Sequence, residues 1–200
     1  PEPEPEPELV PEPKINLVED AYLIEQETKR YIRQQKMQDM ATDIMHVLSP
    51  LVKDGRVSIT QSMQGIKIEI NASVLFSTGH AQLAENSEQT LRAVAEVVRG
   101  HEHEIHVEGH TDNKPIHTTS FPSNWELSTA RASSVVRLFI EKGVDPRRLT
   151  ALGYAEYRQV ATNETSEGRA RNRRVTIMIL SNEPVQETEV PVDIAENEFS

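Results

Sequence analysis

The sequence predicts an α+β fold in which one mixed β-sheet carries its helices on one face. Three segments, 56–71, 104–110 and 173–180, alternate apolar and polar residues, which is typical of strands with one buried side. Two segments between them, 85–99 and 123–142, repeat apolar residues every three to four positions, which is typical of amphipathic helices. The resulting order β-β-α-β-α-β is that of a layered sheet-and-helix sandwich.

The chain divides into four parts: a Pro-Glu linker at 1–13, a long helix at 14–50, the α+β domain at 51–180 and an acidic tail at 181–200. In the linker, proline at every second position excludes helix and sheet and favours an extended polyproline II spacer. Whether this spacer also spans a gap between cell structures stays open. The tail has six acidic residues, no basic residue and no apolar periodicity, so we expect it to be disordered.

Apolar residues recur at three-to-four spacing from Leu17 to Leu48 and predict one long helix over 16–48. Ser49-Pro50 is expected to end this helix, because the residue before a proline avoids the helical conformation. The apolar stripe is narrow and flanked by charges. The helix therefore packs either on its own domain or on a second copy of the chain, and both alternatives remain.

The first strand signal, at 56–71, has the form of a β-hairpin whose turn lies at 63–65. An apolar run, Val74-Leu75-Phe76, then leads into a loop. The helix at 85–99 is expected to end at Gly100, because glycine readily takes the conformation that closes a helix.

The second helix of the domain has a recognisable start. Ser123 and Glu126 have the spacing of a capping box, so the helix is expected to begin there and to run to about Lys142. A short strand at 149–152 and a last strand at 173–180 complete the sheet.

The composition excludes several classes of protein. The formal net charge is −11, yet residues 71–180 carry thirteen acidic and thirteen basic residues, so we expect no nucleic-acid partner. The chain has no cysteine and therefore no disulfide or thiolate metal site. It has no run of about 18 apolar residues that would cross a membrane. Because it begins at Pro1 without an initiator methionine, we expect any signal or anchor to lie upstream.

Asp112 and Arg131 are the most informative pair of residues in the chain. Asp112 directly follows the strand at 104–110, and Arg131 lies in the first turns of the helix that begins near Ser123. An acid and a base fixed on two rigid elements suit a ligand that carries both an ammonium and a carboxylate. The alternative is a purely structural salt bridge. We find no set of nucleophile, base and orienting group, and therefore expect binding without catalysis and without a cofactor.

Four histidines, His101, His103, His106 and His110, lie within ten residues and raise the question of a metal site. None of the usual zinc spacings occurs among them, so we expect no metal ligands there. A metal-dependent hydrolase built on this cluster is the alternative.

Ordered motifs run through the second half of the chain: Phe76-Ser-Thr-Gly-His-Ala81, Glu108-Gly-His-Thr-Asp112, Asn124-Trp-Glu-Leu-Ser-Thr-Ala-Arg131 and Gly168-Arg-Ala-Arg-Asn172-Arg173-Arg174. Together they resemble the OmpA-like peptidoglycan-binding domain, and the resemblance covers roughly residues 70–180. The long loop between Asp112 and Arg131 is similar to that of MotB-type flagellar stator subunits. The resemblance implies the OmpA-like β-α-β-α-β sandwich, preceded here by the long helix and the hairpin.

Such domains bind the diaminopimelate of the peptidoglycan stem peptide, which has a free ammonium and a free carboxylate on one carbon. By this resemblance, Asp112 would accept hydrogen bonds from the ammonium. Arg131 would hold the carboxylate in a bidentate fork that a lysine cannot copy.

The resemblance also places Thr111, Asn124 and Arg173 at the site. A turn-forming role is the alternative for Thr111, and helix capping is the alternative for Asn124. Arg174 lies beside Arg173, and strand alternation allows only one of the two to face inward. We favour Arg173.

The function implied by the resemblance is that of the periplasmic part of a flagellar stator B subunit, which fixes the ion-driven stator to the cell wall. A homodimer is then expected. An upstream transmembrane helix would anchor it to the inner membrane and pair it with a channel-forming stator A subunit. The alternative is a general outer-membrane or lipoprotein-type cell-wall tether with no motor role.

Overall fold

A single five-stranded sheet forms the centre of the domain in the computed structural model, which describes residues 17–181. Its strands are β1 (Val57–Ser62), β2 (Gly65–Asn71), β3 (Ile105–Gly109), β4 (Leu149–Gly153) and β5 (Arg174–Leu180). They lie in the order β1-β2-β5-β3-β4, with β3 and β4 parallel and the other pairs antiparallel. The predicted mixed sheet is thereby confirmed.

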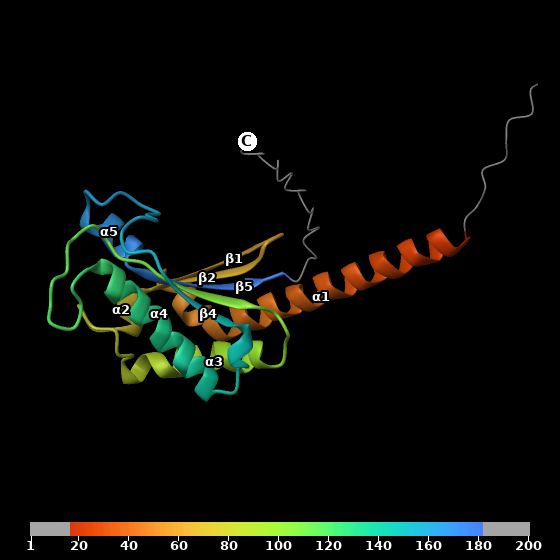
Figure 1. Ribbon diagram of the computed structural model, residues 1–200, viewed down its shortest axis with the longest axis horizontal. Coiled ribbons are helices and arrows are strands. Elements are labelled where there is room, and N and C mark those ends of the chain that lie inside the picture. Colours follow the sequence, from red (N-terminus) through yellow and green to blue (C-terminus); the bar gives the residue numbers. More distant parts are fainter. Residues whose placement is uncertain (1–16, 182–200) are drawn as a thin grey trace, which may run out of the picture.

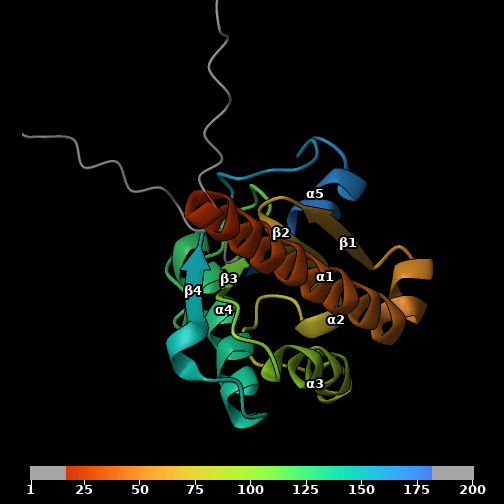
Figure 2. The same ribbon diagram turned by 90° about the vertical axis from the view of Figure 1, so that its right-hand side faces the viewer.

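The helices are α1 (Leu17–Lys53), α2 (Ala72–Leu75), α3 (Glu85–Arg99), α4 (Asn124–Glu141) and α5 (Ser166–Asn172), with a short 3-10 turn, η1 (Pro146–Arg148). Helices α1, α3 and α4 cover one face of the sheet, and α5 lies at one end of it (Figure 1; Figure 2). The prediction of helices on one face is confirmed. The predicted linker at 1–13 and all of the predicted tail except Ser181 lie outside the described residues.

The core is built from rows of β-branched residues that cross the three central strands. Ile68 of β2, Ile177 of β5 and Val107 of β3 lie in register and are fully buried. The row beside it is Ile66, Ile179 and Ile105. Since alternate residues of a strand point to opposite sides, the residues between these apolar ones lie on the face of the sheet away from the helices.

Helix α1 belongs to the domain only in its C-terminal half. There Met40, Ile44 and Leu48 are fully or almost fully buried in the core beneath the sheet. Towards the N-terminus the same stripe continues into solvent, where Ile24 is 63% exposed and Tyr31 is also exposed. This half of the helix projects beyond the sheet (Figure 1). Of the helices in residues 17–181, none is long and apolar enough to cross a membrane.

The predicted stop of the long helix at Ser49-Pro50 is wrong, because α1 continues through Pro50 to Lys53. A proline costs a helix the hydrogen bond of its missing N–H. Here the buried Leu48 and the packed Leu51, one on each side of Pro50, hold the last turn on the core. The chain leaves the helix at Gly55, whose φ is +67°, and the Arg56 N–H closes the end on the Leu51 carbonyl at 2.9 Å.

Two short helices were not expected from the sequence. Helix α2 forms where Val74-Leu75-Phe76 leads into the loop, and the Asn71 side chain caps it by accepting from the Ser73 N–H at 3.0 Å. Helix α5 begins at Thr165, whose hydroxyl accepts from the Gly168 N–H at 3.0 Å. Its sequence, SEGRARN, has no apolar stripe, so it gives no periodic signal.

Helix α4 lies unusually close to the ends of β3 and β4. A Cβ atom added to Gly109 would lie 2.0 Å from the Ser128 carbonyl oxygen, and one added to Gly153 would lie 2.1 Å from the Thr129 hydroxyl. The Ser128 hydroxyl accepts from the Ala155 N–H at 3.1 Å and so ties the helix to the segment after β4. This contact fixes the N-terminal half of α4 relative to the C-terminal end of β3.

Gly109→Ala should therefore destabilise the domain, because the new methyl group forces α4 away from the sheet. We expect a loss of about 1–3 kcal/mol in the free energy of unfolding, measured by denaturant titration. Gly100→Ala is the matched control, since a Cβ at Gly100 meets no atom within 4 Å. Equal stability of the two variants would contradict the close approach.

Candidate functional site

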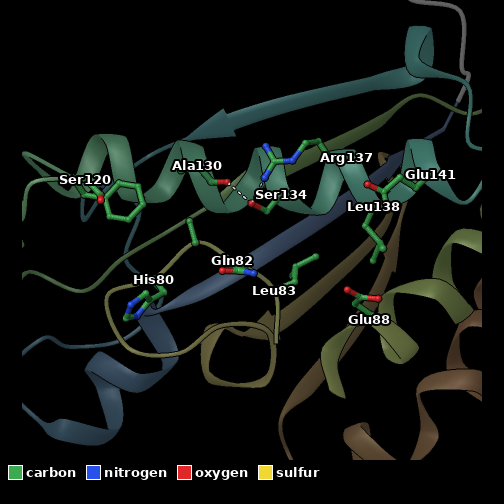
Figure 3. A pocket seen from close by; sticks show the side chains of 12 residues that line it. His80, Gln82, Leu83, Glu88, Ser120, Ala130, Ser134, Arg137, Leu138 and Glu141 are labelled. Atoms are coloured by element: carbon green, nitrogen blue, oxygen red, sulfur yellow. Dashed lines mark hydrogen bonds between the residues drawn. The ribbon is translucent and has the colours of Figure 1, made fainter. Parts of the chain in front are cut away.

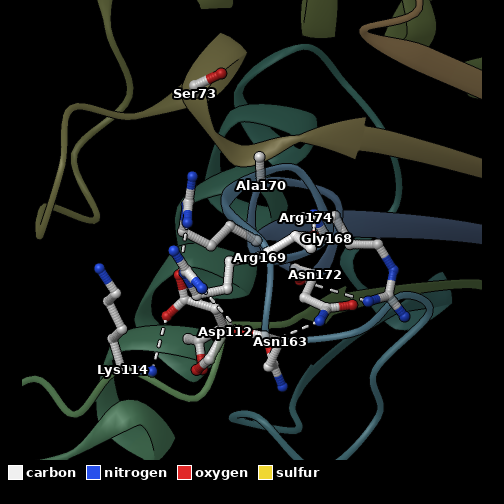
Figure 4. A network of polar contacts seen from close by, with 12 residues as sticks. Ser73, Asp112, Lys114, Asn163, Gly168, Arg169, Ala170, Asn172 and Arg174 are labelled. Atoms are coloured by element: carbon white, nitrogen blue, oxygen red, sulfur yellow. Dashed lines mark hydrogen bonds and ion pairs between the residues drawn. The ribbon is translucent and has the colours of Figure 1, made fainter.

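Asp112 sits just beyond β3 with its carboxylate held at both oxygens. It is 6% exposed. The Lys114 backbone N–H donates to Oδ1 at 3.0 Å, and Arg173 Nη1 donates to Oδ2 at 2.5 Å (Figure 4). The first contact is a local turn that the sequence Asp-Asn-Lys favours. The carboxylate is therefore fixed in position before any ligand arrives.

Arg131 projects from α4 and is also buried, with 4% of its surface exposed. Its Nε donates to the His80 carbonyl at 2.9 Å, and its guanidinium carbon lies 5.1 Å from the centre of the Phe76 ring. Its two terminal Nη groups donate no hydrogen bond to any residue between 17 and 181. The guanidinium is thus held by one edge and by one face, while the paired Nη edge stays available.

The charged neighbours of Arg131 have opposing effects on its pKa. The pKa of Arg131 is lowered to about 10, mainly by burial and further by the positive charge of Arg173, while the negative charge of Asp112 partly offsets both. Arg131 still carries its charge at neutral pH. Two guanidinium groups and one carboxylate therefore act on each other here, and the excess of one positive charge favours an anionic group on a ligand.

Thr111 and Asn124 shape the loop around Asp112. The Thr111 hydroxyl donates to the Asp112 carbonyl at 2.9 Å, and the Thr111 N–H donates to the Ala155 carbonyl at 2.8 Å. Asn124 Nδ2 lies within hydrogen-bond distance of three oxygens, of which the Lys114 carbonyl is the nearest at 3.1 Å. Both side chains are buried and already use their donors within the protein.

The capping alternative for Asn124 is wrong, because Ser123 caps α4. The Ser123 hydroxyl accepts from the Trp125 N–H at 3.1 Å and donates to the Glu126 carboxylate at 2.5 Å. The predicted capping-box pair is therefore formed. Asn124 is left free to brace the loop that precedes the helix.

The side chains of the neighbouring Arg173 and Arg174 contact different parts of the protein. Arg173 precedes β5, and its side chain, 43% exposed, reaches Asp112. Arg174 is buried, donates from Nε to Glu69 at 3.1 Å and contacts the Arg158 carbonyl with both Nη groups. The structure thus brings Arg173, and not Arg174, to Asp112. The role of Arg173 towards a ligand remains a prediction.

Sequence reasoning missed the backbone groups and the ring that hold the two charged residues. They are the His80 carbonyl, the Lys114 N–H and the Phe76 ring. Backbone groups give no side-chain signal. Asn172 was missed as a bracing residue. Its Oδ1 accepts from the N–H groups of Val160 and Ala161 and pins the loop before α5. Its Nδ2 donates to Asn163 Oδ1 at 2.8 Å (Figure 4).

His110 borders this site only through the backbone. Gly109 faces α4, so Glu108 and His110 face the other side of the sheet, where His110 Nε2 lies 3.3 Å from the Glu108 carboxylate. The ring stacks on Tyr154 with 5.4 Å between centroids. Nδ1 is buried and has no hydrogen-bond partner among residues 17–181. In the same part of the chain, no three His, Asp or Glu side chains are placed to hold a metal ion together.

His110 should make stability depend on pH. Burial lowers its pKa below the ordinary value of 6.5, more than the Glu108 carboxylate raises it. The folded state then holds a neutral ring while the unfolded chain takes up a proton, so stability present above pH 6.5 is lost as the pH falls below it. The pKa of Glu108 is itself lowered from 4.5 by its bond to His110, so Glu108 contributes only at lower pH.

We therefore expect the unfolding temperature to fall from about pH 7 to about pH 5, and to fall less in His110→Gln. The quantity compared is the slope of the unfolding temperature against pH in each protein. A general loss of stability in the variant therefore does not affect the comparison. His46→Gln, at an exposed position on α1, is the matched control. An identical slope in His110→Gln and in the unaltered protein would rule out this histidine as the source.

Known proteins resemble this chain over the part that holds the site. The OmpA family pattern matches residues 75–173. An uncharacterised protein of Bacillus subtilis, YtxE, is 36% identical over 149 residues, covering 72% of this chain and 62% of its own length. Motility protein B of the same bacterium is 32% identical over 149 residues, covering 74% of this chain and 57% of its own length. The chain thus spans less than two thirds of both relatives.

A solved structure agrees with the fold. The cell wall anchor of the T6SS from Pseudomonas aeruginosa is 36% identical and superposes with a TM-score of 0.65, covering 69% of this chain and 96% of that one. The matched region contains all five predicted site residues, from Thr111 to Arg173. The chain belongs to the OmpA family.

Proposed function

We propose that Asp112 and Arg131 bind the zwitterionic carbon of diaminopimelate in the peptide stem of peptidoglycan, and that the domain is a non-catalytic cell-wall anchor in the periplasm. The observation that carries the proposal is the state of Arg131. It is almost wholly buried, its guanidinium is fixed by His80 and Phe76, and its Nη edge has no acceptor among the described residues. A buried charge without a full set of partners is costly unless a ligand completes it.

The geometry suits the two charges of the ligand. The paired Nη groups of Arg131 form a fork for a carboxylate, and such bidentate contacts are directional as well as strong. The Asp112 carboxylate has accepting capacity beyond its bonds to Lys114 and Arg173, so an ammonium can join it. Arg173 is the more exposed partner and has room to move as the ammonium enters.

Binding without bond cleavage fits the surroundings of the pair. The buried Ser128 hydroxyl on α4 donates to the Trp125 carbonyl and accepts from the Ala155 N–H, so no base is placed to activate it among the described residues. His110 points to the other face of the sheet. This supports an anchor that holds the wall and leaves it intact.

Within this function, we place the chain in a flagellar stator B subunit that acts as a homodimer with a channel-forming stator A subunit. The similarity to Motility protein B supports this role, as does the long helix that projects from the domain. The alternative is a wall tether without a motor role, which the similarity to a T6SS cell wall anchor supports.

Loss of either charged side chain should weaken wall binding. Arg131→Lys keeps the charge but removes the fork, and Asp112→Asn removes the partner of the ammonium; each should lower the affinity for meso-diaminopimelate about tenfold or more, measured by calorimetry. Co-sedimentation with purified sacculi should fall in parallel. Arg147→Ala is the control, because Arg147 is exposed and pairs with Asp145 in the turn η1, outside the site. Unchanged affinity in both site variants, with unchanged circular dichroism, would refute the site.

The motor role has its own test in the bacterium that carries this gene. Deleting the gene should leave cells with assembled flagella that do not swim, because the motor then lacks its stator B subunit. The unaltered gene should restore swimming and the Arg131→Lys gene should not. Normal swimming of the deletion strain, together with an altered envelope, would favour the tether instead.

A further inference from the structure

A groove of about 520 Å³ runs along α4 and begins at Ala130, the residue before Arg131 (Figure 3). Helix α4 forms one wall, the segment 80–83 and the start of α3 form the other, and Ser120 and Phe121 of the long loop close one end. Its residues on α4 are Ala130, Ser134, Arg137, Leu138 and Glu141. They recur at three-to-four spacing, so they form one continuous face of the helix.

His80 joins this groove to the site. Its carbonyl accepts from Arg131 Nε at 2.9 Å, and its side chain lines the groove. Ala130, at the same end, directly precedes Arg131. One end of the groove therefore lies beside the residues that hold Arg131.

The polarity and charge of the groove lining change along its length. Ala130 and His80 lie at the end near the site, Ser134 and Arg137 follow, and Glu88 and Glu141 lie at the far end (Figure 3). Arg137 is exposed, and only its Nη2 is engaged, donating to the Ser134 hydroxyl at 2.7 Å. Its other donors are available for an acceptor in the groove.

We infer that this groove binds the peptide stem beyond the zwitterion, with Arg137 holding the next free carboxylate. This inference rests on the proposed function of the Asp112 and Arg131 pair. Arg137 lies six positions after Arg131, which is a rise of about 9 Å along the helix and a turn of about 120° around its axis. Two to three extended residues cover the same distance at about 3.3–3.6 Å each. The free zwitterionic carbon of diaminopimelate lies at the end of its side chain, so that side chain and one peptide residue together span about this distance.

The two glutamates at the far end of the groove limit how far an anionic group can extend along it. Glu88 and Glu141 repel a second carboxylate there, so the anionic group stops at Arg137. Leu83 and Leu138 offer apolar contact for the small side chains between charges, and Gln82 offers an amide for the peptide backbone. The groove thus matches a short peptide with one carboxylate near its middle.

The test compares three soluble probes by calorimetry: free meso-diaminopimelate, the tripeptide L-alanyl-γ-D-glutamyl-meso-diaminopimelate, and the same tripeptide with the glutamyl carboxylate amidated. The unaltered protein should bind the tripeptide roughly three- to tenfold more tightly than free diaminopimelate. Arg137→Gln should lose that gain and keep the affinity for diaminopimelate. The amidated tripeptide should lack the gain in both proteins.

Arg92→Gln is the matched control, because Arg92 is an exposed arginine on α3 outside this groove. Equal affinity of the unaltered protein for diaminopimelate and tripeptide would overturn the inference and leave the proposed function intact. Binding of neither probe would instead overturn the proposed function and the inference with it. If a disaccharide-tripeptide binds more tightly still and Arg137→Gln changes nothing, the groove holds glycan and the peptide assignment is wrong.

Discussion

The close approach of α4 to the ends of β3 and β4 is the constraint on which the site depends. Gly109 and Gly153 have no side chain to keep the helix away, and the Ser128 hydroxyl ties it to Ala155. Asp112 follows β3 and Arg131 lies on α4, so this one contact sets the separation of the acid and the base. Recognition of a zwitterion needs that separation fixed within fractions of an ångström.

Asp112 and Arg131 are each held by partners that engage one part of the side chain and leave another part free. Arg131 is held by Nε and by its face, and Asp112 by a backbone N–H and by a second arginine. Such partial engagement limits the rotamer entropy lost on binding. It also means that Arg173 already occupies one oxygen of Asp112, so under the proposed function an incoming ammonium would compete with Arg173 for it.

Much of this architecture was predictable from the sequence, for physical reasons. Strands and long helices repeat apolar residues over several turns or pleats, and the core rows around Ile68 and Ile177 follow that signal. Helix α5 has no apolar stripe, and the passage of α1 through Pro50 depends on the packing of Leu48. Asp112 and Arg131 were found through their motifs, whereas His80 acts through a carbonyl that any residue possesses.

Helix α1 has a mechanical consequence for the domain. Its N-terminal part, residues 17–36, is about 30 Å long, and the side chains from 20 to 36 are mostly exposed. A pull along its axis meets the buried contacts of Met40, Ile44 and Leu48 together, in shear, before any load reaches the edge strand β1. A sideways pull would separate the same contacts one after another. The domain should therefore resist a force along the axis of α1 far better than a force applied sideways to it.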